Sequence, residues 1–284
     1  MMRARIWGCR GSMAKPGPTT LRYGGNTSCV EIRLSDGSIL VFDAGTGIVD
    51  LGKELVREAP PKIHLLLTHL HMDHIEGLGF LGPFGNPASV IELWGPPSPT
   101  MSLEERLSRY LSPPLFPLQL SDIPAQITFH DVPEDEWTIG TATIEASAVE
   151  HPGPTLGYRI TENGKSLAYI PDHEPARVTS SIERASPEWL PGSGIASGAD
   201  VLLHDAQYTL EEYADRISWG HSSFMDAVTY AGVCDAKRLV LFHHDPSRSD
   251  GELEALENES AHVWGTANGS APVLAREGME IELS

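Results

Sequence analysis

The segment Thr68-His69-Leu70-His71-Met72-Asp73-His74 decides how the rest of the chain is interpreted. It places three imidazoles and a carboxylate within six positions, directly after an apolar stretch at 63–68 that predicts a buried strand. His69 and His71 are two positions apart, so in extended or turn geometry their side chains point the same way. Imidazole with carboxylate is a donor set that suits zinc, iron or manganese. The alternative, a run of surface histidines, fits poorly after a buried strand, and the segment therefore predicts a metal site.

The composition limits the classes of protein that the chain can belong to. Its 284 residues, 40% of them hydrophobic, suit one α/β domain over 1–284, because no segment looks like a linker. No stretch is apolar for long enough to span a membrane, and residues 1–10 lack the apolar centre of a signal peptide, so we expect a cytoplasmic protein. The cysteines, Cys9, Cys29 and Cys234, contain no CxxC pair and are expected to be buried thiols. A formal net charge of −19 disfavours a polyanionic partner such as tRNA.

Hydrophobic patterning predicts strands followed by helices, twice along the chain. The expected strands lie at 3–9, 28–34, 39–43, 63–68, 89–94, 127–131, 141–149, 155–161, 166–170, 201–204 and 238–242, with short strands in 273–283. The expected helices lie at 48–59, 103–111, 222–234 and from about 250. A proline-rich, irregular region at 96–124 follows the histidine cluster, and such loops often shape access to a site. This order suits two sheets stacked face to face with helices outside, an αββα four-layer sandwich.

Five motifs, in order along the chain, resemble those of the metallo-β-lactamase superfamily. Segment 69–74 resembles the HxHxDH motif of that family. The other four are Phe42-Asp43-Ala44-Gly45-Thr46-Gly47, Glu150-His151-Pro152, Tyr169-Ile170-Pro171-Asp172 and Leu241-Phe242-His243. Because the match spans nearly the whole chain, the resemblance implies the αββα sandwich and a metal-dependent hydrolase.

The resemblance also implies a ligand set divided between two divalent metal ions, with zinc as the first choice and manganese or iron as alternatives. The implied ligands are His69, His71 and His151 for one ion, Asp73, His74 and His243 for the other, and Asp172 as the bridge. A water or hydroxide shared by the ions would be the nucleophile. His244 is the alternative to His243 as the last ligand. His173 is expected to be a neighbour of the ligand Asp172 and not a ligand itself. Asp43 is either the orienting partner of an imidazole or a residue of a helix-entry turn.

Two later motifs resemble the ribonuclease Z-like and phosphoribosyl cyclic phosphodiesterase-like branch. Leu203-His204-Asp205-Ala206 resembles the HEAT motif of ribonuclease Z with aspartate in place of glutamate, and Trp219-Gly220-His221-Ser222-Ser223 resembles a later histidine motif. The implied catalytic residues are Asp73, His221 and Asp205, with His221 protonating the leaving oxygen or binding a phosphate oxygen and Asp205 orienting it. The alternative for His221 is a structural residue beside a helix cap. The segments 8–12 and 23–28 are either anion-binding loops or ordinary glycine-rich turns.

These observations favour a phosphodiesterase that acts on a small or cyclic phosphodiester. The chain is acidic and shows no long insertion resembling the arm with which ribonuclease Z grips tRNA, so an RNA-processing endonuclease is the second hypothesis. A non-catalytic, metal-dependent sensor or binding module is the third, and the complete ligand set argues against it. We expect no membrane partner, and a homodimer stays open.

Overall fold

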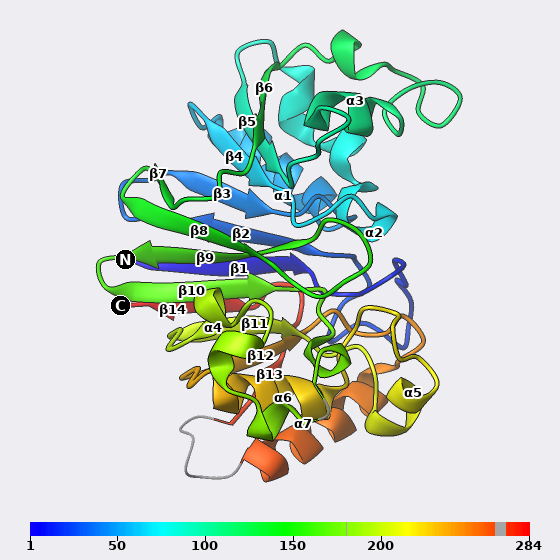
Figure 1. Ribbon diagram of the computed structural model, residues 1–284. Coiled ribbons are helices and arrows are strands. Elements are labelled where there is room, and N and C mark those ends of the chain that lie inside the picture. Colours follow the sequence, from blue (N-terminus) through cyan, green and yellow to red (C-terminus); the bar gives the residue numbers. More distant parts are fainter. Residues whose placement is uncertain (180, 265–270) are drawn as a thin grey trace.

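Two β-sheets form the centre of the structure, and helices cover the outer face of each (Figure 1). The computed structural model describes residues 1–179, 181–264 and 271–284. Within these ranges each sheet has seven strands. The first has the order β14 (Glu280–Leu283), β1 (Met2–Gly8), β2 (Cys29–Arg33), β3 (Ile39–Phe42), β4 (Ile63–Leu66), β5 (Val90–Gly95), β6 (Gln126–Asp131). The second has the order β13 (Val273–Leu274), β12 (Leu239–Phe242), β11 (Val201–Asp205), β10 (Lys165–Ile170), β9 (Leu156–Glu162), β8 (Ala142–Ala148), β7 (Trp137–Ile139).

The helices divide between the two outer faces (Figure 1). The α-helices are α1 (Ile48–Glu58), α2 (Met72–Ile75), α3 (Leu103–Ser108), α4 (Ser193–Ala196), α5 (Leu210–Ala214), α6 (Phe224–Val233) and α7 (Asp250–Trp264). Short 3₁₀ helices are η1 (Leu78–Phe80), η2 (Gly82–Gly85), η3 (Leu120–Asp122), η4 (Pro175–Arg177), η5 (Ile182–Arg184) and η6 (Pro187–Trp189). In the part of the chain that is described, no helix combines the length and the apolarity that crossing a membrane requires.

Alternation along the strands produces the four layers. In β3, Leu40 and Phe42 join the core between the two sheets, whereas Ile39 and Val41 join the core under α1. The same alternation divides β10 and β12 between the central core and the core under α6. Successive side chains of a strand point to opposite faces, so a strand covered on both sides is apolar throughout. The expected αββα sandwich is confirmed.

The parallel strands bring the motifs to one edge of the sandwich. Strands β3 to β6 are parallel in the first sheet, and β10 to β13 are parallel in the second. The loops that leave β3, β4, β10, β11 and β12 therefore meet at the carboxyl ends of these strands, where α/β proteins form their binding sites. Each of the five loops carries one of the motifs identified in the sequence.

Most expected elements are present, and the differences have local causes. The strands expected at 28–34 and 39–43 are present as β2 and β3, which pair in antiparallel orientation through a turn at Asp36-Gly37. Helix α3 ends at Ser108 rather than near 111, although Leu111 is still buried. Strand β7 and the short helix α5 were not predicted, because three and five residues give too little periodicity. The three cysteines are buried and free, as expected.

Candidate metal centre

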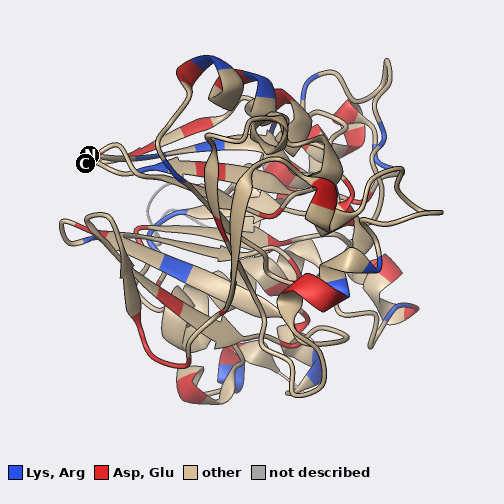
Figure 2. Cartoon of the chain, turned by 90° about the horizontal axis from the view of Figure 1, so that it is seen from above, with Lys and Arg blue, Asp and Glu red and all other residues tan. Residues whose placement is uncertain are grey.

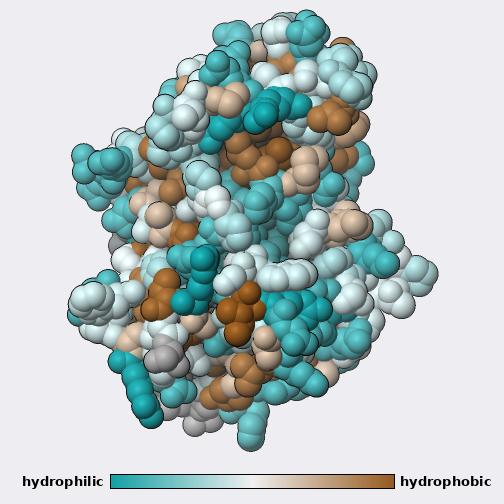
Figure 3. All heavy atoms as spheres, turned by 45° about the vertical axis from the view of Figure 1, so that its right-hand side comes forward, coloured by the Kyte–Doolittle hydropathy of each residue, from teal (hydrophilic) through white to brown (hydrophobic). Residues whose placement is uncertain are grey.

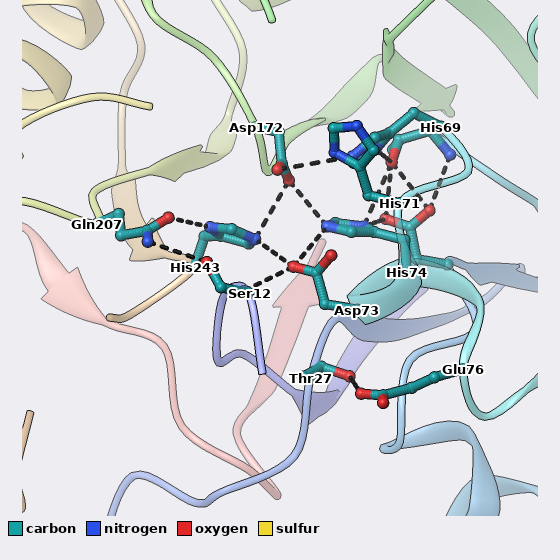
Figure 4. A network of polar contacts seen from close by, with 12 residues as sticks. Ser12, Thr27, His69, His71, Asp73, His74, Glu76, Asp172, Gln207 and His243 are labelled. Carbon is teal, nitrogen blue, oxygen red and sulfur yellow. Dashed lines mark hydrogen bonds and ion pairs between the residues drawn. The ribbon is translucent and has the colours of Figure 1, made fainter. Parts of the chain in front are cut away.

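The residues implied by the motifs lie together, and Figure 4 shows His69, His71, Asp73, His74, Asp172 and His243 among them. One group follows β4 and opens α2, and the other comes from the second sheet, after β8, β10 and β12. Within the described ranges, three-residue groups with donor atoms within 4.8 Å of one another include His69, His71, His151 on one side and Asp73, His74, His243 on the other. Asp172 stands between them, because its carboxylate oxygens lie 3.8 Å from His69 Nε2 and 3.4 Å from His243 Nε2. The structure thus brings together the residues that the resemblance implies for each ion.

Four of the imidazoles are held by their Nδ1 atoms, which leaves Nε2 to point toward the centre. The Nδ1 partner atoms are Thr68 Oγ1 for His69 at 3.0 Å, the Asp43 carboxylate for His74 at 2.8 Å, Gly220 O for His151 at 2.7 Å and Gln207 Oε1 for His243 at 3.0 Å. Such contacts fix the tautomer and orientation of a metal-binding histidine. His71 differs, since its Nδ1 faces His151 Nε2 at 3.1 Å and its side chain is exposed. The cluster is therefore open to solvent on the side of His71.

The centre of the cluster contains buried nitrogen and oxygen atoms that could bind a metal and that form no hydrogen bond. Within the described residues these include His69 Nε2, His74 Nε2 and Asp172 Oδ1. His74 Nε2 lies 3.0 Å from Asp172 Oδ1, and Figure 4 shows both pointing into the same space as Asp73. A buried polar atom without a partner is costly, so unpartnered nitrogen and oxygen atoms that converge on one point need a common partner. A divalent cation fits this donor set.

The electrostatics of the cluster also fit a cation. Burial lowers the pKa of His69 well below its usual value, which favours the neutral imidazole that binds metal. Burial acts the same way on His74, but the carboxylates of Asp172, Asp73 and Asp43 outweigh it and raise the pKa of this histidine. These carboxylates therefore favour positive charge at the centre, whether it is a proton or a metal ion.

Asp43 sits at a point of backbone strain that serves the cluster. Its φ is 59°, a left-handed conformation in which aspartate is more common than most residues. Its carboxylate accepts hydrogen bonds from Thr68 N at 2.8 Å, from Tyr169 Oη at 3.0 Å and from His74. Of the two interpretations left open for Asp43, the structure therefore favours the orienting partner.

His221 lies beside the cluster and is held by a carboxylate. Its Nδ1 is 2.8 Å from Asp205 Oδ2 and 3.8 Å from Asp172 Oδ2. Burial lowers the pKa of His221, but Asp205, Asp172 and Asp73 outweigh burial and raise it to about 9. The imidazolium is then the dominant form at neutral pH. His221 also belongs to two of the three-residue groups that could hold a metal.

The geometry bears on three further predictions. His243 faces Asp73 at 3.1 Å, whereas His244 Nε2 is 2.8 Å from the Ala275 carbonyl oxygen and points away, which leaves His243 as the last member of the cluster. His173 pairs with His204 through ring nitrogens 3.0 Å apart and is a neighbour, as expected. The amides of Gly11 and Ser12 donate to His244 O and to Asp73 respectively, so these two are not free for a substrate anion.

Two residues that position the cluster were not found from the sequence. Gln207 bonds His243 through Oε1 and Ser12 Oγ through Nε2. The buried carboxylate of Glu174 accepts from Ser218 N and Gly220 N, both at 2.7 Å, and so fixes the loop that carries His221. The one available signal was that Gln207 and Glu174 each lie two positions after a motif aspartate at a strand end.

The four layers, with a histidine–carboxylate cluster at the strand ends, define the class of protein: a hydrolase of the metallo-β-lactamase fold. Residues 39–244 match the family model of the beta-lactamase superfamily domain, and the chain belongs to this superfamily. The resemblance to its ribonuclease Z-like branch is also confirmed.

Individual relatives agree with this membership. The uncharacterized protein Rv1339 of Mycobacterium tuberculosis (strain ATCC 25618 / H37Rv) is 30% identical over 264 residues, covering 89% of this chain and 85% of that protein. The ribonuclease Z of Natronomonas pharaonis is 26% identical over 297 residues, covering 87% of this chain and 89% of the enzyme. The crystal structure of a diphosphatase from the PhnP family superposes with a TM-score of 0.68 at 21% identity, covering 100% of this chain and 98% of that one.

Proposed function

We propose that this protein is a phosphodiesterase that depends on two divalent metal ions, with zinc as the first choice, and acts on a small or cyclic phosphodiester. The observation that carries the proposal is the convergence on one buried point of His69 Nε2, which has no hydrogen-bond partner, with His74 Nε2 and Asp172 Oδ1, which lie 3.0 Å apart. His69, His71 and His151 would hold one ion, Asp73, His74 and His243 the other, and Asp172 would bridge them. Bound ions would acidify a water molecule and stabilise negative charge on the phosphate oxygens.

The residues around the proposed ions have the geometry for the remaining steps. His221 is held at Nδ1 by Asp205, so Nε2 is the ring atom that can give a proton to the leaving oxygen. Cations beside Asp73 and Asp172 would offset their effect on the pKa of His221, which leaves Asp205 as the group that keeps it protonated. The Asp73 carboxylate accepts a hydrogen bond from Ser12 N at 2.7 Å, which fixes its position beside the proposed ion.

Three observations support a phosphodiester rather than another hydrolysable bond. Asp172 lies between the two groups of residues and would bridge two ions, an arrangement suited to in-line attack at phosphorus. The pair of His221 and Asp205 supplies an acid for an oxygen leaving group. Two of the similar proteins are a ribonuclease Z and a diphosphatase, both of which act on phosphate esters or anhydrides by their names.

The charge of the chain supports a small substrate. Asp and Glu number 39 against 20 Lys and Arg, and Figure 2 shows the positions of Asp and Glu spread along the chain with fewer Lys and Arg positions among them. Such a surface repels the backbone of a long nucleic acid, whose binding depends on many cationic contacts. RNA cleavage of the ribonuclease Z type remains the second candidate, because a ribonuclease Z is among the relatives.

Metal content and turnover test the proposal together. Purified protein should hold close to two equivalents of metal and hydrolyse bis(p-nitrophenyl) phosphate, whereas His69→Ala and Asp172→Ala should lose metal and turnover. Full activity of Asp172→Ala without metal would contradict the proposal, and metal binding without turnover of any ester would favour a sensor or binding module.

Comparison of substrates of different size tests the second part. Small diesters should turn over with higher kcat/KM than precursor tRNA at physiological salt. Much faster cleavage of the tRNA at its 3′ end would favour the ribonuclease hypothesis.

A single domain over 1–284, a cytoplasmic location and the possible homodimer stay predictions.

A further inference from the structure

A cleft opens directly beside the exposed side of the cluster. Its volume is about 350 Å³, at the small end of the range for ligand pockets. The residues that line it are His69, Leu70, His71, Pro96, Ser98, Thr100, Met101, Arg106, Arg109, Pro152, Gly153 and Pro154. One wall therefore belongs to the candidate metal centre, and the opposite wall belongs to α3 and the loop before it.

The cleft combines an apolar floor with a cationic edge. Leu70, Met101 and prolines supply the apolar part. In the view of Figure 3, a hydrophobic area bordered by hydrophilic side chains is visible in the upper half of the molecule. Arg106 and Arg109 are three positions apart at the end of α3, so both lie on the same side of the helix. None of the described residues that line the cleft is acidic, which is unusual in a chain of net charge −19.

The two arginines differ in how they are held. Arg106 Nη2 lies 2.6 Å from the Pro96 carbonyl oxygen and 3.8 Å from Asp131, so this guanidinium is fixed in place. Arg109 is exposed, and in the described part of the chain its side chain takes part in no hydrogen bond or ion pair. A free guanidinium at the edge of a cleft is suited to an anion, which it can bind in bidentate geometry.

We propose that this cleft binds one arm of the phosphodiester and that Arg109, with Arg106 beside it, recognises a second anionic group on that arm. The substrate class is then a small phosphodiester that carries a further phosphate or carboxylate, with a sugar or base against the apolar floor. This inference rests on the proposed function, because it places the scissile phosphate at the neighbouring cluster. A volume of about 350 Å³ accommodates a nucleotide but not a folded RNA.

A matched pair of chromogenic esters tests the inference. Thymidine 5′-(p-nitrophenyl phosphate) and its 3′-phosphorylated form differ only in the second anion. The metal-loaded protein should hydrolyse the 3′-phosphorylated ester with a kcat/KM roughly 10- to 100-fold higher, the effect of a hydrogen bond to a charged group. The difference should lie mainly in KM, because the second anion binds equally in the ground and transition states. Arg109→Ala should abolish the preference, and Arg109→Lys should restore part of it.

Arg57→Ala is the control, because Arg57 is an exposed arginine of α1 that does not line the cleft. It should leave the preference unchanged. Equal hydrolysis of both esters by the wild type, a preference that survives in Arg109→Ala, or an equal loss in Arg57→Ala would overturn the inference while leaving the proposed function intact.

Direct binding keeps the two proposals separable. Calorimetry with thymidine 3′,5′-bisphosphate and thymidine 5′-phosphate should show tighter binding of the bisphosphate, lost in Arg109→Ala, whether or not any ester is turned over. If no ester is hydrolysed, the proposed function fails and this measurement alone decides the anion site: equal affinities overturn it.

Discussion

Replacing Asp43 by asparagine should weaken metal binding without changing the shape of the site. Asparagine tolerates the left-handed φ of 59° and has the same size as aspartate, so the backbone can stay in place. If its oxygen stays toward Thr68 N, its amide nitrogen faces His74 Nδ1 and Tyr169 Oη, both of which donate to Asp43 in the native protein. His74 must then carry its proton on Nε2, the atom that the proposed metal needs.

The size of the effect follows from the contacts that are lost. Replacing a group that orients a metal-bound histidine typically costs 10- to 100-fold in affinity, or about 1.4–2.7 kcal/mol. A hydrogen bond to a charged group contributes about 1.5–3 kcal/mol, so the loss of the His74–Asp43 contact accounts for the whole change. Stability of the metal-free protein should fall by about 1–3 kcal/mol, because the buried Tyr169 hydroxyl loses its acceptor.

The measurement is competition with a chromogenic chelator for the dissociation constant, together with urea unfolding of the chelated protein. Glu162→Gln is the matched control, since Glu162 is 2% exposed and accepts from Ser35 N at 2.9 Å, but lies in β9 outside the cluster. It should lower stability and leave the metal affinity unchanged. A native dissociation constant in Asp43→Asn, or an equal weakening in Glu162→Gln, would refute the orienting role.

Further predictions concern the acid, a remote histidine and the central core. His221→Ala should keep its metal but lose on the order of 10²–10⁴ in rate for poor alkoxide leaving groups and little for p-nitrophenolate; lost metal would instead identify a ligand. Because Asp205 raises the pKa of His221, Asp205→Asn should move the alkaline limb of the kcat–pH profile to lower pH, and an unmoved limb would exclude this coupling. Burial and Lys62 lower the pKa of His64 in the folded protein to about 4, whereas the pKa of histidine in an unfolded chain is near 6.5. Below pH 6.5 the unfolded chain therefore binds a proton at His64 more readily than the folded protein does. The free energy of unfolding should therefore fall as pH drops from 6.5 toward 4, and urea unfolding should show a weaker pH dependence for His64→Gln. Leu203 is fully buried between the sheets, and Leu203→Ala should lower the free energy of unfolding by about 2–5 kcal/mol. The control is Val56→Ala, which shortens an exposed apolar side chain on α1 and should change this free energy by less than about 0.5 kcal/mol in the same assay.

The layers and most members of the cluster could be predicted because they depend on local pattern. The continuous apolar runs of β3 and β12 predict two buried faces, and the spacing of His69 and His71 predicts a shared direction. The choice between His243 and His244 could not be made locally. The two are adjacent, and the decision depends on the backbone at His243, whose φ is 61° and turns its ring toward Asp73.

The residues that hold the cluster in place depend on contacts distant in sequence. Gln207 meets His243 from 36 positions away, and Glu174 meets Gly220 from 46 positions away. No periodicity carries such information, because each pair forms only after the sheets and their loops are assembled. For Asp43 the sequence predicted the motif but could not decide between two roles, because its contact with His74 forms only in the folded protein.

If the cluster binds metal, its division between the two sheets would link metal supply to the lifetime of the protein. Under the proposed assignment, ions bound jointly by the loop after β4 and by loops of the second sheet would tie together halves that also adhere through apolar packing and through hydrogen bonds such as that from Tyr169 to Asp43. Free metal at 1,000 times the dissociation constant would add about 4 kcal/mol to the folded state, a large part of the 5–15 kcal/mol typical of a domain. Molecules that fail to acquire metal would then open more often and be degraded first. A cell short of the metal would thus lose the protein itself, and not only its turnover.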